Sequence, residues 1–206
     1  LNKLIEAIKL IYASTFNSED RTLLKNTEHR IVAEKMAILI QEVVGIKYNS
    51  NRFYPTFSGV LQSINYYPVS YMKRNEGVAY LALGFGRTIS DGEKCLRISP
   101  KYPKILPQFF SLKATIQNSQ NEFYAMSFNL NQQNHQLNKY TLDDAETDGT
   151  LKWVGSSISK EDGTIKDSLF YAGTRIVSFS PILKWGNISF DKLALEILSI
   201  CKKALG

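Results

Sequence analysis

The sequence predicts a mixed α+β fold with a mixed or antiparallel sheet flanked by helices, and three features lead to this class. The first residues carry an amphipathic helical stripe, the middle of the chain carries short apolar segments bounded by turn residues, and the last residues carry a second helical stripe. With 206 residues, 44% of them hydrophobic, the chain can bury a substantial core as one large domain or two small ones.

The N-terminal part is expected to hold two helices and a strand. Residues 3 to 13 place one apolar stripe at helical spacing, formed by Leu4, Ile5, Ile8, Ile11 and Tyr12. Residues 17 to 26 predict a second, short helix capped by Ser18. Residues 38 to 44 form a nearly continuous apolar run that ends at Gly45, which predicts a buried strand.

Three further strands are expected before residue 100. Residues 52 to 64 form an extended segment interrupted by Pro55 and by the Ser58-Gly59 pair, which favours an edge strand or a bulge. Residues 77 to 86 predict the next strand, followed by a polar helix or turn that begins at Arg87, and residues 94 to 99 predict another.

The second half of the chain has a looser pattern. We interpret residues 129 to 140 as an amide-rich polar stretch, and residues 143 to 153 and 159 to 164 as solvated turns. Short strands are expected at residues 122 to 128, 151 to 157 and 175 to 179. The chain closes on a helix over residues 189 to 206, whose expected buried face is Leu193, Ile197, Ile200, Cys201 and Leu205.

The positive charge of the chain is concentrated in one segment. The net charge is +6, and residues 46 to 110 hold nine basic residues against three acidic ones, so this segment carries the whole excess. The basic residues are Lys47, Arg52, Lys73, Arg74, Arg87, Lys94, Arg97, Lys101 and Lys104. Such a segment attracts anions such as nucleotide phosphates or nucleic acid, although it is also compatible with an ordinary solvated face.

The glycines at residues 84 to 92 form no standard phosphate-binding motif. Gly84 and Gly86 are followed by no further glycine before Gly92, so neither GxGxxG nor the GxxxxGK[ST] loop is present. Glycine at the end of a strand permits close approach of a ligand, and it equally permits a tight turn. The local pattern leaves both interpretations open.

No catalytic or metal site is expected from the remaining motifs. The carboxylates of residues 144 to 149 resemble half of a calcium loop, but Gly155 stands where the bidentate glutamate is required. His29 and His135 have no partners at a catalytic spacing, and Cys95 and Cys201 are expected to be free thiols.

Two expectations concern the cellular location of the chain and whether it is a piece of a longer protein. No window approaches the roughly 18 apolar residues of a membrane span, and the first residues are not typical of a signal peptide, so we expect no membrane partner and a cytoplasmic location. The chain opens on Leu1 instead of methionine, which suggests a piece of a longer protein.

Five stretches, taken in order, resemble the nucleotide-binding domain of the phosphoenolpyruvate synthase and pyruvate phosphate dikinase family: EKMAILIQEVVG, FYPTFSGVLQS, YYPV, GVAYLALGFGRTISDG and LRISPKYP. The family patterns are VQxM, SGVxFT and GLGExVVxG. Their counterparts here are residues 40 to 43, 58 to 60 and 84 to 92. The second half resembles a linking region found in a subgroup of the family.

The resemblance implies an ATP-grasp fold, in which adenine lies between two subdomains. Residues 1 to 105 would belong to the nucleotide-binding domain, and residues 106 to 206 would form a linking or insert region packed on it. The implied adenine hinge is Gln41, Glu42, Val43 and Val44. Ser58 and Gly59 would lie in a flexible loop near the phosphates, and Gly84, Gly86 and Arg87 would lie near the nucleotide.

The family uses ATP and Mg²⁺ to phosphorylate a histidine on another domain, which then phosphorylates pyruvate. This chain departs from the family in having Arg87 where glutamate is usual and Val43 where methionine is usual. The magnesium-binding carboxylates are expected after Gly206 and the phosphate-gripping lysine and arginine before Leu1. We therefore expect no kinase activity from this chain alone, weak nucleotide affinity, and partnership with the other domains of its polypeptide.

Two other functions stay open. The departures fit a catalytically degenerate binding or regulatory module with the same fold. The basic segment also fits single-stranded nucleic acid, although aromatic residues at this density more often pack in a core. Its stacking candidates are Tyr48, Phe53, Tyr54, Tyr66, Tyr67 and Tyr71.

Overall fold

The computed structural model describes residues 2–14, 37–48, 51–127, 136–185 and 190–205. The chain divides into two compact units, Leu1–Val43 and Val44–Gly206, and each is described by itself. The short helix expected at residues 17 to 26 lies outside the described residues, as do His29 and His135.

The first unit contains one described helix, α1 (Asn2–Ser14), which confirms the expected N-terminal helix. None of its described residues is buried, and Leu4, Ile5, Ile11 and Tyr12 are all more than 40% exposed. The apolar stripe therefore predicts the helix correctly without predicting that the stripe is covered.

The buried strand expected at residues 38 to 44 is wrong. Residues 37 to 45 have no regular secondary structure, and Leu39 and Ile40 are 80% and 62% exposed. The strand that follows, β1 (Ile46–Lys47), begins two residues later and pairs only through its two residues with β2. A strand requires neighbours for its backbone N–H and C=O groups, and the described residues offer none to residues 37 to 45.

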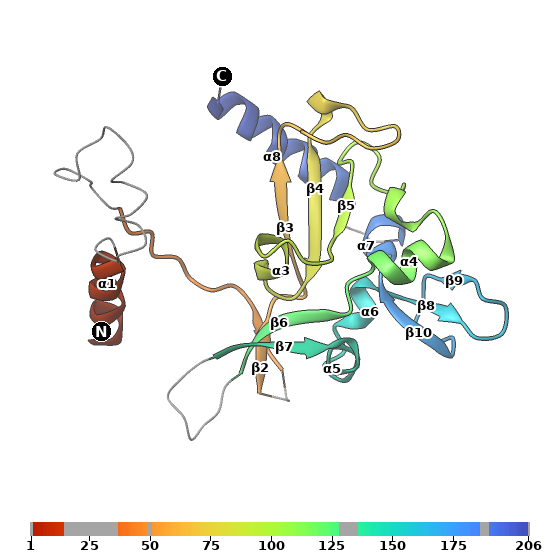
Figure 1. The fold of residues 1–206 in the computed structure, drawn as a ribbon, viewed down its shortest axis with the longest axis horizontal. Helices are drawn as coiled ribbons and strands as arrows, with labels where there is room; N and C mark the ends of the chain where they lie inside the picture. The colour runs from red at the N-terminus through yellow and green to blue at the C-terminus, as the bar shows by residue number, and fades with distance from the viewer. Residues whose placement is uncertain (1, 15–36, 49–50, 128–135, 186–189, 206) are drawn as a thin grey trace, which may run out of the picture. The chain divides into compact units, whose positions relative to one another are not determined.

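The described residues of the second unit form three sheets, in which all pairings are antiparallel (Figure 1). The first has the order β1-β2-β6-β7 and adds β2 (Arg52–Tyr54), β6 (Glu122–Ser127) and β7 (Gln136–Thr141). The second has the order β3-β4-β5, with β3 (Phe57–Gln62), β4 (Val78–Leu83) and β5 (Leu96–Ile98). The third has the order β10-β8-β9, with β8 (Gly155–Ser159), β9 (Ile165–Lys166) and β10 (Gly173–Val177).

These sheets confirm several strand predictions. The expected interruption at Pro55 occurs, because the chain leaves β2 for β3 at Pro55 and Thr56. The Ser58-Gly59 pair does not interrupt the chain or lie in a loop, because both residues are paired with β4 within β3. β3 is an edge strand in its sheet, as the proline and the Ser58-Gly59 pair suggested. β4 and β5 form at the expected places, and α3 (Arg87–Ser90) is the expected short helix after the glycines.

One hydrophobic core joins the three sheets of the second unit. Tyr54 and Phe123 come from the first sheet, with ring centroids 4.7 Å apart, and both are essentially unexposed. Leu83 from the second sheet and Val177 from the third belong to the same cluster. The sheets are therefore parts of one packed body.

The second half is more helical than expected. Residues 143 to 153, interpreted as solvated turns, contain α5 (Leu142–Thr147) and α6 (Leu151–Val154). The strand expected at residues 151 to 157 is thus wrong in its first four residues, because Leu151 and Val154 are fully buried on one side of a helical turn. The sequence reasoning also missed α4 (Leu112–Asn118) and α7 (Ser180–Trp185), and β7 lies in the amide-rich stretch.

Two 3-10 turns and the terminal helix complete the described elements. The turns are η2 (Arg74–Glu76) and η3 (Pro107–Phe109). α8 (Phe190–Leu205) confirms the predicted terminal helix and contacts β3. Its buried face differs from the expected one, because Ala194 and Leu198 are buried whereas Ile197 and Ile200 are exposed.

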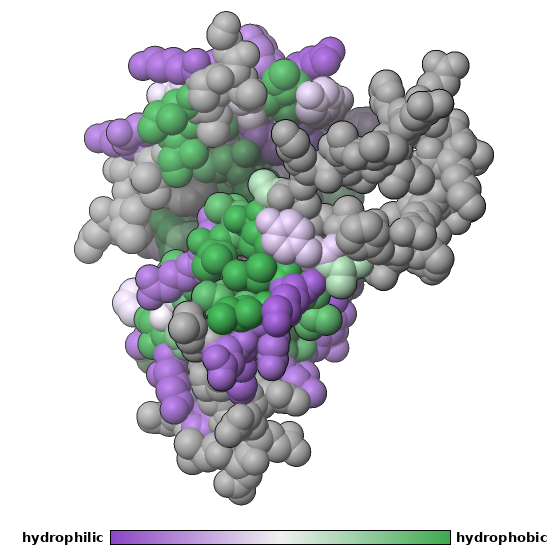
Figure 2. All heavy atoms as spheres, turned by 90° about the vertical axis from the view of Figure 1, so that its left-hand side faces the viewer, coloured by the Kyte–Doolittle hydropathy of each residue, from purple (hydrophilic) through white to green (hydrophobic). Residues whose placement is uncertain are grey.

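Hydrophobic side chains also reach the surface. Figure 2 shows hydrophobic residues beside hydrophilic ones on the face that it draws. Within the described part of the chain, the most exposed large hydrophobic residues include Phe170, Phe110 and Tyr67. Of the helices in that part, none combines the length and the apolar character needed to span a membrane.

Candidate functional site

The turn between β4 and α3, residues 84 to 87, is fixed against the first sheet. Gly84 has a φ of 77°, a conformation that favours glycine, and a Cβ atom added there would lie 2.7 Å from the carbonyl oxygen of Tyr124. The next residue, Phe85, donates its backbone N–H to that same oxygen at 3.1 Å. Gly84 is therefore required by the fold itself.

A buried glutamine holds the end of β4 just before this turn. Gln120 accepts the backbone N–H of Leu83 at 2.8 Å through Oε1 and donates to the Leu83 carbonyl at 3.1 Å through Nε2. The side chain is 3% exposed and so replaces a neighbouring strand at this position. The turn consequently starts from a rigid support.

Ser58 and Gly86 lie next to each other across the same turn. A Cβ atom added to Gly86 would lie 3.6 Å from Ser58 Oγ, which is an ordinary contact, and Gly86 has a φ of −65° that any residue adopts. Neither backbone conformation nor space in the described part therefore requires glycine at position 86. Gly59 differs, because an added Cβ atom would lie 3.0 Å from Leu81 Cδ2 and 3.1 Å from the Tyr80 carbonyl oxygen.

Two hydroxyl groups near this turn lack partners. Ser58 Oγ and Thr88 Oγ1 are buried and make no hydrogen bond with any residue that the structure describes. A buried polar group without a partner costs free energy, and most such groups in folded proteins are satisfied. An additional hydrogen-bonding group could satisfy them.

Arg87 belongs to a cluster of alternating charges around Tyr124. Its Nε lies 3.0 Å from Asp91 Oδ2, and its guanidinium carbon lies 5.1 Å from the centre of the Tyr124 ring. Tyr124 donates its hydroxyl to Glu93 at 3.1 Å, and Lys139 Nζ lies 2.6 Å from the same Glu93 oxygen. The cluster therefore pairs two cations with two carboxylates around one aromatic ring.

These contacts shift three pKa values upward. The hydrogen bond that Arg87 donates to Asp91 raises the pKa of Arg87, and burial first, then the hydrogen bond to Glu93, raises the pKa of the Tyr124 hydroxyl. The hydrogen bond to Glu93 raises the pKa of Lys139. All three groups therefore keep their protons at neutral pH, and none of them can act as a base there.

The other predicted site residues, Gln41, Glu42, Val43 and Val44, lie in the segment without regular structure. All four are exposed, Val43 at 52% and Val44 at 77%. Gln41 to Val43 end the first unit, whereas Val44 begins the second. The structure therefore brings Ser58, Gly84, Gly86 and Arg87 together with Gly59 nearby, all within the second unit.

The basic segment is partly neutralised by carboxylates. Arg52 lies 2.7 Å from Asp144 and 2.8 Å from Asp148, whose side chain is only 2% exposed. Tyr54 donates its hydroxyl to the same Asp148 at 2.8 Å, and burial is the main cause that raises the pKa of Tyr54. Lys101 likewise pairs with Glu76 at 3.1 Å.

Nucleic-acid binding loses part of its support in this geometry. Tyr54 is fully buried and packs against Tyr48, with ring centroids 4.6 Å apart, so it is not available for stacking on a base. Tyr66 and Tyr67 are exposed, at 62% and 81%. The six aromatic candidates therefore do not form one continuous exposed platform.

The comparisons with known proteins decide the family. Residues 1–176 match the family model described as pyruvate phosphate dikinase, AMP/ATP-binding domain. The chain belongs to this family. The resemblance found in the sequence is thus confirmed, and the mixed α+β structure with antiparallel sheets is consistent with an ATP-grasp-like domain of the pyruvate phosphate dikinase family. No curated protein and no solved structure matches the chain.

Sequence reasoning missed several residues that shape this part of the pyruvate phosphate dikinase domain. Gln120, Tyr124 and Lys139 support the turn or surround Arg87, and they lie more than 30 residues beyond it in the chain. No local motif marks them. The contact of Gly84 with Tyr124 arises only when β6 packs beside the end of β4.

Proposed function

We propose that this chain forms part of the ATP-binding domain of an ATP-dependent phosphotransferase that resembles phosphoenolpyruvate synthase. The observation that carries the proposal is the match of residues 1–176 to a domain described as binding AMP or ATP. In the whole protein, ATP would phosphorylate a histidine on a separate domain, and this histidine would pass the phosphoryl group to pyruvate. The chain would contribute binding and positioning of the nucleotide.

The proposed phosphate-facing surface is the turn at Gly84, Gly86 and Arg87 together with Ser58 and Gly59. Two observations support it: Gly86 is a glycine that the described fold does not require, and Ser58 Oγ beside it is buried without a partner. A nucleotide oxygen near Ser58 would give this hydroxyl an acceptor. The absence of a side chain at Gly86 would let the ligand approach the backbone closely.

The proposed adenine hinge is the segment Gln41, Glu42, Val43 and Val44. Adenine in such a site is held by hydrogen bonds to backbone N–H and C=O groups. The segment forms no strand in the described structure, so its backbone is not committed to a sheet there. We propose that it becomes ordered when adenine and the other subdomain of the nucleotide site are present.

Magnesium is part of the proposal for the whole protein only. The described residues contain no group of three or more His, Cys, Asp or Glu side chains placed to hold a metal ion, so this part of the chain offers no complete site of that kind. We propose that other residues of the polypeptide hold Mg²⁺. The nucleotide-binding part, residues 1 to 105, and the linking region, residues 106 to 206, would act together with those residues. We also propose that the protein works in the cytoplasm.

A second candidate function is a catalytically degenerate binding module. The observation that favours it is Arg87, which stands where the family has glutamate and is already paired with Asp91 and packed over Tyr124. A guanidinium held in this way is not free to replace a carboxylate that contacts the nucleotide. The module would retain the fold and lose the reaction.

Titration calorimetry with AMP, and with ATP and Mg²⁺, tests the proposal on this chain. We expect weak binding, with a Kd of roughly millimolar order, and no turnover of ATP. Arg87→Glu restores the family residue and is expected to tighten AMP binding by about fivefold.

The matched control is Lys113→Glu, which reverses one exposed positive charge on α4. It should leave AMP binding unchanged. No detectable AMP binding by any variant would refute a nucleotide site in this chain, whereas micromolar binding with turnover would refute the expectation of an inactive fragment.

A further inference from the structure

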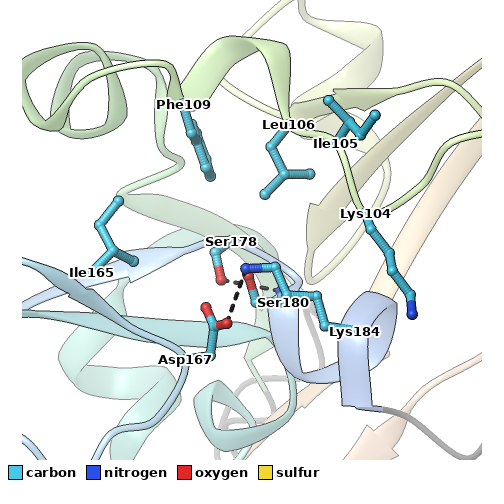
Figure 3. Close-up of a pocket in the computed structure, with 9 residues that line it drawn as sticks. All are labelled: Lys104, Ile105, Leu106, Phe109, Ile165, Asp167, Ser178, Ser180 and Lys184. Atoms are coloured by element: carbon cyan, nitrogen blue, oxygen red, sulfur yellow. Dashed lines mark hydrogen bonds and ion pairs between the residues drawn. The ribbon is translucent and has the colours of Figure 1, made fainter.

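A pocket of about 330 Å³ lies in the second unit, and none of the residues that line it is among those proposed for the nucleotide (Figure 3). The residues that line it are Lys104, Ile105, Leu106, Phe109, Ile165, Asp167, Ser178, Ser180 and Lys184. Three of these residues, Ser178, Ser180 and Lys184, lie beyond the part of the chain that matches the family model. The matched range therefore covers only the other six lining residues of the pocket.

One wall of the pocket is a connected polar network. Lys184 Nζ lies 3.0 Å from Asp167 Oδ2, and Ser156 Oγ donates to Asp167 Oδ1 at 3.3 Å. Ser156 and Ser178 share a hydrogen bond of 2.6 Å between their hydroxyl oxygens, and Ser178 Oγ accepts the backbone N–H of Ser180 at 3.1 Å. These bonds hold the carboxylate and the ammonium group in fixed positions.

A strained residue orients this wall. Phe179, between the two serines, has a φ of 56° although it is not glycine, and its side chain is fully buried. The ring packs edge-on against Phe57 with centroids 6.0 Å apart, and its backbone N–H donates to the Val154 carbonyl at 2.8 Å. Packing in the core therefore holds Phe179 in a backbone conformation that costs about 1 kcal/mol or more. This conformation fixes the neighbouring Ser178 and Ser180 beside the pocket.

The opposite wall is apolar. Figure 3 shows Leu106 and Phe109 across the pocket from Ser178 and Ser180. Ile105 and Ile165 extend this apolar lining. A ligand that fills the pocket consequently needs an apolar body on one side and a polar group on the other.

The charges around the pocket favour one negative charge on the ligand. Lys104 and Lys184 are positive and Asp167 is negative, which leaves an excess of one positive charge. Lys184 is already paired with Asp167, whereas Lys104 is exposed and forms no ion pair with any described residue. A second negative charge on the ligand would be repelled by Asp167.

We propose that this pocket binds a small monocarboxylate with an aromatic or aliphatic body, with Lys104 pairing to the carboxylate and Phe109 packing on the body. The site is independent of the proposed nucleotide site. Its occupancy therefore does not require AMP or ATP to bind.

The test is a titration of the ¹⁵N-labelled chain with benzoate, followed by amide chemical shifts, with neutral benzamide as the matched probe. We expect saturable shifts at residues 104–109, 165–167 and 178–184. Lys104→Met should weaken benzoate binding by about tenfold, and the exposed control Lys113→Met should leave it unchanged. Added AMP should not compete with benzoate.

A second variant tests the pocket without relying on charge. Ile165→Trp places a larger side chain in the pocket and should abolish the benzoate shifts while the remaining amide spectrum keeps its dispersion. The proposal is overturned if benzoate gives no saturable shifts, if benzamide binds as well as benzoate, or if Lys104→Met and Lys113→Met weaken binding equally.

Discussion

Residues 37–45 and residues 78–86 are both apolar runs closed by glycine, and they differ in their surroundings. The second run forms β4, which pairs with β3 on one side and β5 on the other, and Leu83 at its end is fully buried. The first run has no strand neighbour among the described residues, and Leu39 is 80% exposed. The difference teaches that an apolar run becomes a strand only where other segments bind its backbone and cover its side chains.

Gly45, which closes the first run, and Gly84, which directly follows β4 in the second, have similar contacts but different backbone conformations. A Cβ atom added at Gly45 would lie 2.7 Å from Phe53 Cε1, at the end of a side chain. One added at Gly84 would lie 2.7 Å from the Tyr124 carbonyl oxygen, which is backbone, and only Gly84 of the two has a positive φ. Glycine is therefore required more strictly at position 84, at the end of β4, than at position 45.

The largest expected effect comes from shortening one leucine in each run. Leu83→Ala removes a fully buried side chain from the core and should lower the free energy of unfolding by about 3 kcal/mol. Leu39→Ala removes a largely exposed side chain and should change it by less than about 0.5 kcal/mol. Urea unfolding of both variants measures the difference, and equal losses would show that residues 37–45 are packed in solution.

A smaller effect is expected from adding a methyl group at Gly84. Gly84→Ala combines a positive φ with a backbone clash and should cost about 2 kcal/mol in stability. Gly92 is the matched control, because it also has a positive φ, 70°, but nothing lies within 4 Å of an added Cβ atom. Gly92→Ala should cost about 1 kcal/mol. If the two variants unfold at the same urea concentration, the contact with Tyr124 contributes nothing.

The smallest effect on stability is expected at Gly86. Gly86→Ala meets only an ordinary contact with Ser58 and should change the free energy of unfolding by less than about 0.5 kcal/mol. Its effect should appear in AMP binding, which we expect to weaken by about threefold or more because the methyl group occupies the approach to the backbone. Urea unfolding measures the change in stability, and titration calorimetry measures the change in AMP affinity. A stable variant with unchanged AMP affinity would leave the turn without a role in nucleotide binding.

Predictions from sequence succeeded where the deciding signals were local. Pro55 separates β2 from β3, and the glycines after residue 83 end β4 and begin α3, so each boundary is marked by residues at the boundary itself.

The helix α4 was missed although a local signal marks it. The Ser111 side chain accepts the backbone N–H of Ala114 at the start of α4, and this capping signal could have identified the helix.

Predictions failed where the deciding partner lies far away in the chain. Asp148 was assigned to a solvated turn, but its carboxylate is buried by Arg52, which is 96 residues away. The buried face of α8 was misjudged for the same reason, because contact with β3 decides which residues are covered. For the candidate site, family resemblance pointed to Ser58 and the glycines, whereas Gln120 and Tyr124 follow only from the packing of distant strands.

The exposed run at residues 37–45 has a consequence for the behaviour of many copies of the chain together. Its first five residues, Ala-Ile-Leu-Ile-Gln, are uncharged and contain branched side chains that favour intermolecular strand pairing. Glu42 is the only charged residue in the run, so copies stacked in register would bring identical negative charges together. Repulsion between these charges disfavours in-register stacking, which is the effect of a gatekeeper residue.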